Sequence, residues 1–115
     1  MCGITGIISY GNNKEEYLSK IEIATAALSK RGPDGHGVFV HQHVAIGHRR
    51  LSVIDTTDAA TQPMFDGSGR YVIVYNGEFF NYKEHRNRLL DHGVLLKNYS
   101  DTEVLLNLYI LEGEK

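Results

Sequence analysis

Residues 1–10 read Met1-Cys2-Gly3-Ile4-Thr5-Gly6-Ile7-Ile8-Ser9-Tyr10. β-Branched residues are frequent in this stretch and the turn-forming Gly11-Asn12-Asn13 follows it, a pattern that predicts a buried strand. The single cysteine of the chain therefore stands at the start of a strand. One cysteine excludes an intrachain disulfide and argues against a disulfide-stapled secreted domain.

A helix and a hairpin are predicted next along the chain. Asn13 and Glu16 have the spacing of a helix cap, and apolar residues recur at helical spacing up to Arg31, where Gly32-Pro33 ends the helix. Two apolar runs, 38–40 and 44–46, then flank a polar turn, which is the pattern of a β-hairpin.

The second half of the chain is divided by turn residues and capping patterns. In order, it predicts a short apolar run at 51–54, a surface loop at 56–65, a turn at 66–69, a strand at 71–75 with the strongest strand signal of the chain, and helices at 82–90 and 100–113. Strands mixed with three helices predict an α+β fold. No linker or repeat marks a boundary, so we expect one domain over residues 1–115.

Composition excludes several classes of function. The 115 residues are 42% hydrophobic and 23% charged, values ordinary for a soluble domain. Twelve basic and 14 acidic side chains leave a net charge of -2, which argues against binding to nucleic acid or anionic lipid. No run of about 18 apolar residues could span a bilayer, and no signal peptide pattern is present, so we expect a cytoplasmic location.

Cys2 directly follows the initiator methionine, so loss of Met1 would leave a thiol and a free α-amine on one residue. An α-amine ordinarily has a pKa of about 8 and a thiol one of about 8.5, so the amine can accept the proton of the thiol. This is the arrangement of an N-terminal nucleophile, which needs no histidine partner. From position alone, a small buried strand residue is the better interpretation, so other residues must decide.

Three further positions could complete an acyl-transfer site. Asn76-Gly77 offers a side-chain amide and an approachable backbone N–H for an oxyanion, although an Asn-Gly pair is more often a hairpin turn. One of Arg49 and Arg50 could hold a carboxylate, although paired arginines more often end a solvated strand. Asp101, in the first turn of a capped helix, could bind an ammonium group or simply stabilise the helix dipole.

Metal and phosphate sites are poorly supported. The chain has six histidines, but no zinc-finger spacing of cysteine and histidine and no HExxH motif, so we expect no metal. The glycine-dense segment 31–37 lacks the Lys-Ser/Thr of a phosphate loop and does not follow a strand. We interpret it as a loop that lies over a site.

Six motifs occur in a set order along the chain. They are Met1-Cys2-Gly3-Ile4-Thr5-Gly6, Arg31-Gly32-Pro33-Asp34, Gly47-His48-Arg49-Arg50-Leu51-Ser52-Val53-Ile54-Asp55, Gln62-Pro63-Met64, Asn76-Gly77-Glu78-Phe79-Phe80-Asn81-Tyr82 and Ser100-Asp101-Thr102-Glu103. With them the chain resembles the glutaminase domain of glutamine-hydrolysing asparagine synthetases, among the class II glutamine amidotransferases. Other members of that class follow the arginine with an aromatic residue, so Arg50-Leu51-Ser52 favours the asparagine synthetase type.

The resemblance implies a four-layer αββα sandwich of two antiparallel sheets, of the N-terminal nucleophile hydrolase type. Because the family's glutaminase domain is longer than this chain, we expect residues 1–115 to hold only its N-terminal part. The resemblance also implies that a C-terminal, ATP-dependent synthetase domain lies outside this chain.

The resemblance assigns catalytic roles to Cys2 as the nucleophile, to its α-amine as the base, and to Asn76 and Gly77 as the oxyanion hole. Other residues would bind glutamine. Those implied are Arg50 at the α-carboxylate, Leu51, Ser52, Val53 and Ile54 along the pocket wall, Asn76 and Gly77 again, and Glu78 and Asp101 at the α-amine.

The implied partners are L-glutamine and the synthetase domain, which would bind ATP and aspartate. No cofactor is implied for residues 1–115, whereas ATP and Mg²⁺ are expected in the synthetase domain, where ammonia would convert activated aspartate to asparagine. A homodimer is an open option. One departure concerns His85, which stands where the family more often has leucine, so the packing of its helix is in question.

Two alternatives stay open. A related amidotransferase could act on another carboxylate, since acceptor choice would depend on the synthetase domain. The 115-residue piece could also be an inactive truncated fragment, because half a sandwich would expose an apolar sheet face.

Overall fold

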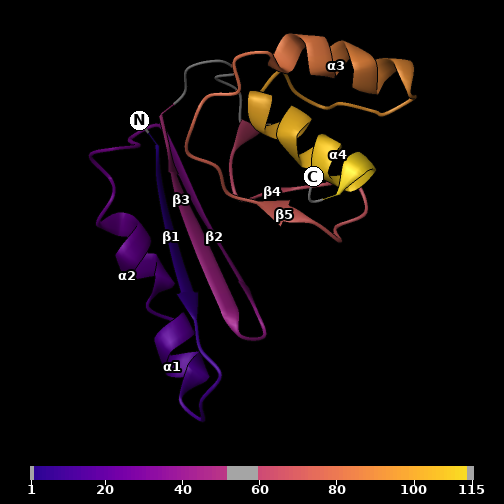
Figure 1. The fold of residues 1–115 in the computed structure, drawn as a ribbon. Coiled ribbons are helices and arrows are strands. Elements are labelled where there is room, and N and C mark those ends of the chain that lie inside the picture. Colours follow the sequence, from indigo (N-terminus) through magenta and orange to yellow (C-terminus); the bar gives the residue numbers. More distant parts are fainter. Residues whose placement is uncertain (1, 52–59, 114–115) are drawn as a thin grey trace.

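The computed structural model describes residues 2–51 and 60–113, and Figure 1 shows two antiparallel sheets with helices beside each. The larger sheet contains β1 (Gly3–Ile8), β2 (Gly35–His41) and β3 (Val44–Arg50), and the smaller one β4 (Met64–Phe65) and β5 (Val72–Ile73). The helices are α1 (Lys14–Leu18), α2 (Ile21–Ala26), α3 (Tyr82–Asp91) and α4 (Asp101–Glu112). The predicted α+β class is confirmed.

The larger sheet has the strand order β1-β3-β2, with β3 pairing antiparallel to both neighbours. The predicted hairpin is confirmed as β2 and β3, which turn through Gln42 at a φ of 51°. Both strands are longer than the predicted runs 38–40 and 44–46. Ladder hydrogen bonds join backbone groups and do not require apolar side chains, so pairing extends through glycine and arginine positions.

The single helix predicted from Asn13 to Arg31 is wrong, because the structure has two short helices there. The Ser19 hydroxyl donates to the Glu16 carbonyl at 2.7 Å, and this competition for a carbonyl accompanies the end of α1. Asn13 precedes α1, but its side chain makes no capping hydrogen bond.

Helix α2 covers one face of the larger sheet. Leu18, Ile21 and Ala45 form a buried cluster there, with Ile7 and Val38 packed against it. Beside this cluster the hydroxyls of Thr5 and Thr25 lie 3.1 Å apart. They cross over Gly47, where a Cβ would meet the Thr25 hydroxyl at 2.0 Å, so only glycine allows the helix to approach so closely.

The opposite face of the larger sheet carries exposed apolar side chains among the described residues. Residues alternate across a strand, so Ile4 and Ile8 point away from α2, as does Val44 opposite Ile8. All three are exposed, Ile8 to 68%. This face therefore exposes apolar side chains at Ile4, Ile8 and Val44, whereas His48 on the same face is buried.

The smaller sheet differs from the prediction in two ways. The predicted strand 71–75 is reduced to Val72–Ile73, and the predicted loop 56–65 contains strand β4 at its end, while residues 56–59 lie outside the described part. A strand needs a hydrogen-bonded partner, and β5 pairs only with the two residues of β4 among the described residues. The intervening turn is confirmed, with the Asp66 carboxylate accepting from the N–H groups of Ser68 and Tyr71.

The two predicted C-terminal helices are confirmed as α3 and α4, which pack together with Leu89 and Val104 fully buried. The Ser100 hydroxyl accepts from the Glu103 N–H at 3.2 Å, which is the expected N-cap. The reciprocal half of the capping box is absent, because the Glu103 carboxylate instead accepts from the N–H groups of Lys97 and Asn98.

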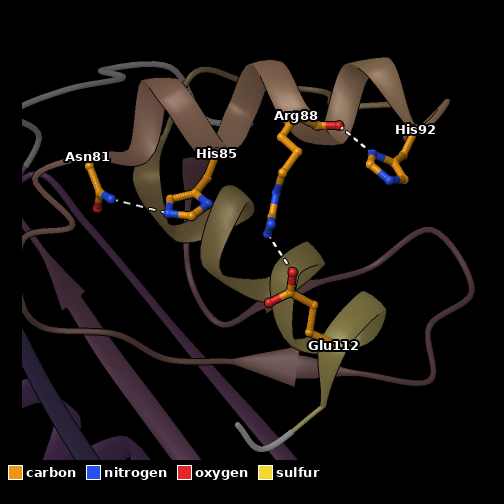
Figure 2. Close-up of polar contacts among 5 residues, drawn as sticks. All are labelled: Asn81, His85, Arg88, His92 and Glu112. Carbon is orange, nitrogen blue, oxygen red and sulfur yellow. Dashed lines mark hydrogen bonds and ion pairs between the residues drawn. The ribbon is translucent and has the colours of Figure 1, made fainter.

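His85 is accommodated on α3 by a polar contact rather than by apolar packing alone. Its Nε2 lies 3.1 Å from the Asn81 amide nitrogen, and its ring lies 5.4 Å from that of Phe79. Figure 2 shows this contact beside the ion pair between Arg88 of α3 and Glu112 of α4. Within the described part of the chain, no helix is both long and apolar enough to cross a membrane.

The close approach of α2 to β3 at Gly47 should make the stability of the domain sensitive to substitution there. Gly47→Ala inserts a methyl group against Thr25 and Thr5, so we expect the free energy of unfolding to fall by about 1–3 kcal/mol, as for other overpacked sites. Gly67→Ala is the matched control, since a Cβ there has nothing within 4 Å. Denaturant titration of the protein and both variants measures the difference. Equal destabilisation by the two variants would contradict the account.

Candidate active site

A cleft of about 600 Å³ opens where the N-terminal end of β1 meets the chain after β5 and the start of α4. Among the residues predicted for a site, seven line this cleft: Cys2, Arg50, Leu51, Asn76, Gly77, Glu78 and Asp101. The other three, Ser52, Val53 and Ile54, lie outside the described residues. Segments that are distant in the sequence thus come together at one cavity.

Cys2 is half-buried at the edge of the cleft. Its Sγ accepts a hydrogen bond from the Leu51 N–H at 3.3 Å, and its thiol is oriented to donate to the Leu51 carbonyl at 3.7 Å. The Cys2 carbonyl accepts from Arg31 Nε at 3.2 Å. The nucleophile candidate is therefore held on two sides, by the end of β3 and by the loop that follows α2.

The alternation of β3 separates the two neighbouring arginines. Arg50 shares the face of Cys2 and lines the cleft. It is buried, with 8% of its surface exposed. Arg49 points to the other face and donates from Nε to the Gly32 carbonyl at 3.0 Å. Arg50 is thus the cleft arginine, and Arg49 instead contacts the segment between α2 and β2. The predicted loop 31–37 is wrong for residues 35–37, which belong to β2, whereas Arg31 lies beside Cys2, as its hydrogen bond to the Cys2 carbonyl shows.

Asn76 and Gly77 follow β5 in an irregular segment that leads directly into α3. The Asn-Gly pair is therefore not the turn of a hairpin. Both residues are exposed and line the cleft. The side chain of Tyr75 packs on Gly77, where a Cβ would stand 2.9 Å from the Tyr75 hydroxyl, so a larger residue would displace this segment.

Two carboxylates lie on the side of the cleft near α4. Asp101 is 8% exposed, and its Oδ2 accepts from the Phe79 N–H at 3.1 Å, which joins the first turn of α4 to the segment after Gly77. Burial, together with the negative charges of Asp101 and Glu78, raises the pKa of Tyr75. Its phenol therefore stays protonated and lies within the electrostatic reach of both carboxylates.

The charges that line the cleft are complementary to those of a small zwitterion. It combines a guanidinium, two carboxylates and a thiol in one cavity, with a side-chain amide and backbone N–H groups nearby. No group of three or more histidine, cysteine or acidic side chains that could hold a metal ion occurs in the residues the structure describes.

Comparison with known proteins identifies the family to which the chain belongs. The model of a family described as "Glutamine amidotransferase domain" matches residues 1–115. The chain belongs to this family. The resemblance inferred from the six motifs is therefore confirmed at the level of the family.

Several curated relatives of this glutamine amidotransferase domain carry asparagine synthetase names. The chain is 41% identical over 113 residues to glutamine-hydrolyzing asparagine synthetase 3 of Bacillus subtilis, covering 96% of this chain. It is 32% identical to glutamine-hydrolyzing asparagine synthetase of Asparagus officinalis over 114 residues and 99% of this chain. It is also 31% identical to "Amidase chry2" of Gibberella zeae over 120 residues and 95% of this chain. The chain spans only 18%, 19% and 18% of these three relatives.

Some residues that line this amidotransferase cleft are not predicted as site residues from the sequence. Tyr75, Gln62 and Thr102 line it, as do the apolar rings of Phe79, Phe80 and Tyr82. Gln62 and Thr102 belong to two of the six motifs, which was the available signal. Tyr75 ends the predicted strand 71–75 and carries no local sign of its long-range contacts.

His48 is another residue that sequence reasoning assigned to no role. It is fully buried on β3, and its Nε2 lies 3.1 Å from the Tyr75 carbonyl. Burial lowers the pKa of His48, and the neighbouring charge of Arg50 lowers it further, against the opposing effect of the Tyr75 carbonyl. The imidazole is therefore neutral in the folded domain at physiological pH.

Because the pKa of His48 is lowered in the folded state, we expect the stability of the domain to depend on pH. As pH falls below about 6.5, the unfolded chain protonates His48 before the folded one does, so the free energy of unfolding falls by up to about 1.4 kcal/mol per pH unit. The loss ends below the lowered pKa of the folded state. Unfolding measured from pH 8 to pH 5 should show a smaller decline in His48→Gln than in the unmodified protein, while the hairpin-turn control His43→Gln keeps it. Parallel curves for the unmodified protein and His48→Gln would contradict this assignment.

Proposed function

We propose that this glutamine amidotransferase domain is the glutamine-hydrolysing half of an asparagine synthetase. The observation that carries the proposal is the gathering of a thiol, a guanidinium, two carboxylates and an oxyanion-type Asn-Gly pair in one cleft. The names of the relatives support the choice of asparagine synthetase among glutamine amidotransferases.

Glutamine fits the charges of the cleft. Its α-carboxylate would pair with Arg50, because a guanidinium binds a carboxylate through two parallel hydrogen bonds. Its α-ammonium group would face Asp101 and Glu78. The side-chain amide would then reach toward Cys2, with Leu51, Ser52, Val53 and Ile54 completing the pocket wall.

Catalysis would use Cys2 after removal of Met1. The α-amine of Cys2 takes the thiol proton, and the thiolate attacks the side-chain amide carbon of glutamine. Asn76 and Gly77 donate hydrogen bonds to the resulting oxyanion. The amine returns its proton to the departing nitrogen, which leaves as ammonia, and a thioester remains on Cys2.

Water then completes the cycle. The α-amine accepts a proton from water as the water oxygen attacks the thioester carbon, and the thiol leaves with that proton. Glutamine and water are thereby converted to glutamate and ammonia, with Cys2 restored. Neither step requires an oxidant, a reductant or a metal.

The rest of the proposed activity would belong to a synthetase domain, because the chain spans only 18% of the asparagine synthetase to which it is 41% identical. A synthetase domain would bind ATP, Mg²⁺ and aspartate, and an internal channel would deliver ammonia to the activated aspartate. The intact glutaminase domain would form a four-layer αββα sandwich, with further strands over the face that exposes Ile4 and Ile8. A cytoplasmic location and a homodimer belong to the same proposal.

A second candidate is amidation of another carboxylate. One relative, "Amidase chry2" of Gibberella zeae, does not carry an asparagine synthetase name, so relatives of this domain are not all named for asparagine synthesis. The glutamine site would be the same in both cases. Assays of the intact protein with aspartate and with other carboxylic acids would distinguish the two candidates by which acid consumes the ammonia.

Removal of the thiol tests the glutaminase step. In Cys2→Ala we expect release of glutamate from glutamine to fall by about 10³-fold or more, since no nucleophile remains. Synthesis with added ammonium salt in place of glutamine serves as the control and should survive, because it bypasses Cys2. Glutamate release at the unmodified rate in Cys2→Ala would refute the proposed function.

A further inference from the structure

The backbone of Tyr75 is held by side chains rather than by a strand. Strand β5 ends at Ile73, yet the Tyr75 N–H donates to Gln62 Oε1 at 2.6 Å, and the Tyr75 carbonyl faces His48 Nε2 at 3.1 Å. Both backbone hydrogen-bonding groups of the residue just before Asn76-Gly77 are thus satisfied by long-range side-chain contacts. This is unusual, because most backbone groups in a folded chain pair with other backbone groups.

The two side chains are buried and fastened to different parts of the fold. His48 is 0% exposed and stands in the middle strand of the larger sheet, opposite Ile4 of β1 and Gly37 of β2. Gln62 is 6% exposed, and its Nε2 donates to Thr102 Oγ1 of α4 at 3.2 Å. His48 therefore connects Tyr75 to the sheet that carries Cys2, and Gln62 connects it to the helix that carries Asp101.

The backbone groups of Tyr75 determine which atoms of His48 and Gln62 donate and which accept. A backbone carbonyl can only accept, so His48 Nε2 carries the proton and donates it to Tyr75. Gln62 accepts through its oxygen and donates through its nitrogen, so it bridges Tyr75 and Thr102 in one orientation. Leucine at either position would leave a Tyr75 backbone group without its buried partner.

We propose that His48 and Gln62 are positioning residues that hold the Asn76-Gly77 segment at the distance from Cys2 which oxyanion stabilisation requires. The inference rests on the proposed glutaminase function. In this role neither side chain contacts the reacting atoms of glutamine. They act through Tyr75, whose carbonyl belongs to the same peptide group as the N–H of Asn76.

A positioning role differs measurably from a general contribution to folding. Misplaced oxyanion donors weaken the transition state but leave binding of the α-carboxylate and α-amine groups intact. Loss of either contact should therefore lower kcat and leave KM for glutamine nearly unchanged. Loss of a whole oxyanion-hole donor costs about 10²–10³-fold in kcat, so a displaced donor should cost about 10–100-fold.

The test uses the intact protein and measures kcat and KM for glutamate release, with the Kd for glutamate as a check on the folded cleft. His48→Leu and Gln62→Leu remove the two contacts. His48→Gln keeps a donor near the position of Nε2, and Gln62→Glu keeps the acceptor for the Tyr75 N–H. His43→Leu is the matched control, because His43 makes the same type of contact, at 3.1 Å to the Ser9 carbonyl, at the far end of the sheet.

We expect both leucine variants to lose about 10–100-fold in kcat, with KM and glutamate Kd within about twofold of the unmodified values. His48→Gln should recover part of the loss, and His43→Leu should show none. Unchanged kcat in both leucine variants, or a parallel loss of kcat and glutamate binding, would overturn the inference. Absence of glutamate release from the unmodified protein would instead refute the proposed function.

Thr102→Val gives a second test if a leucine variant does not fold. Valine has nearly the shape of threonine, and the change removes only the hydroxyl that anchors Gln62. Loss of one hydrogen bond of ordinary strength predicts a fall in kcat of about fivefold at unchanged glutamate Kd. A Thr102→Val protein with unmodified kcat would count against the role of Gln62.

Discussion

The antiparallel pairing of β1 with β3 determines which side chains meet in the cleft. Gly3 pairs with Arg49, so the residue before Gly3 lies beside Arg50, and the Leu51 N–H reaches Cys2 Sγ at 3.3 Å. Because side chains alternate along a strand, a slip of one residue would turn Arg50 toward α2 and Arg49 toward the cleft. The register is secured on the helix side by Gly47, where only a glycine fits beneath Thr25.

The other wall of the cleft is built differently. Asn76 and Gly77 lie outside any strand, and the hydrogen bonds that fasten this segment come from side chains on either side of it. Tyr75 is bound to His48 and Gln62, and Phe79 is bound to Asp101. A segment held in this way keeps its own N–H groups and amide free of ladder bonds. Such groups can be directed at a developing oxyanion.

Local patterns in the sequence predict α3, α4 and the β2–β3 hairpin because their signals lie within a few residues of each element. Ser100, for example, caps α4 through the Glu103 N–H three residues later. Alternation alone does not reveal which of Arg49 and Arg50 faces a site, since that depends on where α2 packs. The motif resemblance selects Arg50, and the structure shows it lining the cleft. The contacts of His48 and Gln62 join residues 27 and 13 positions apart from Tyr75 and leave no periodic trace, so no local pattern could predict them.

The proposed glutaminase reaction depends on attack by Cys2 on glutamine with its own α-amine as the base. Mass spectrometry of the N-terminal peptide, after the intact protein is mixed with glutamine and rapidly quenched in acid, tests it most directly. We expect a peptide that begins at Cys2 and carries a γ-glutamyl group on the sulfur, which disappears at alkaline pH with hydroxylamine. A peptide that retains Met1 while the protein hydrolyses glutamine, or a γ-glutamyl group on another residue, would contradict it.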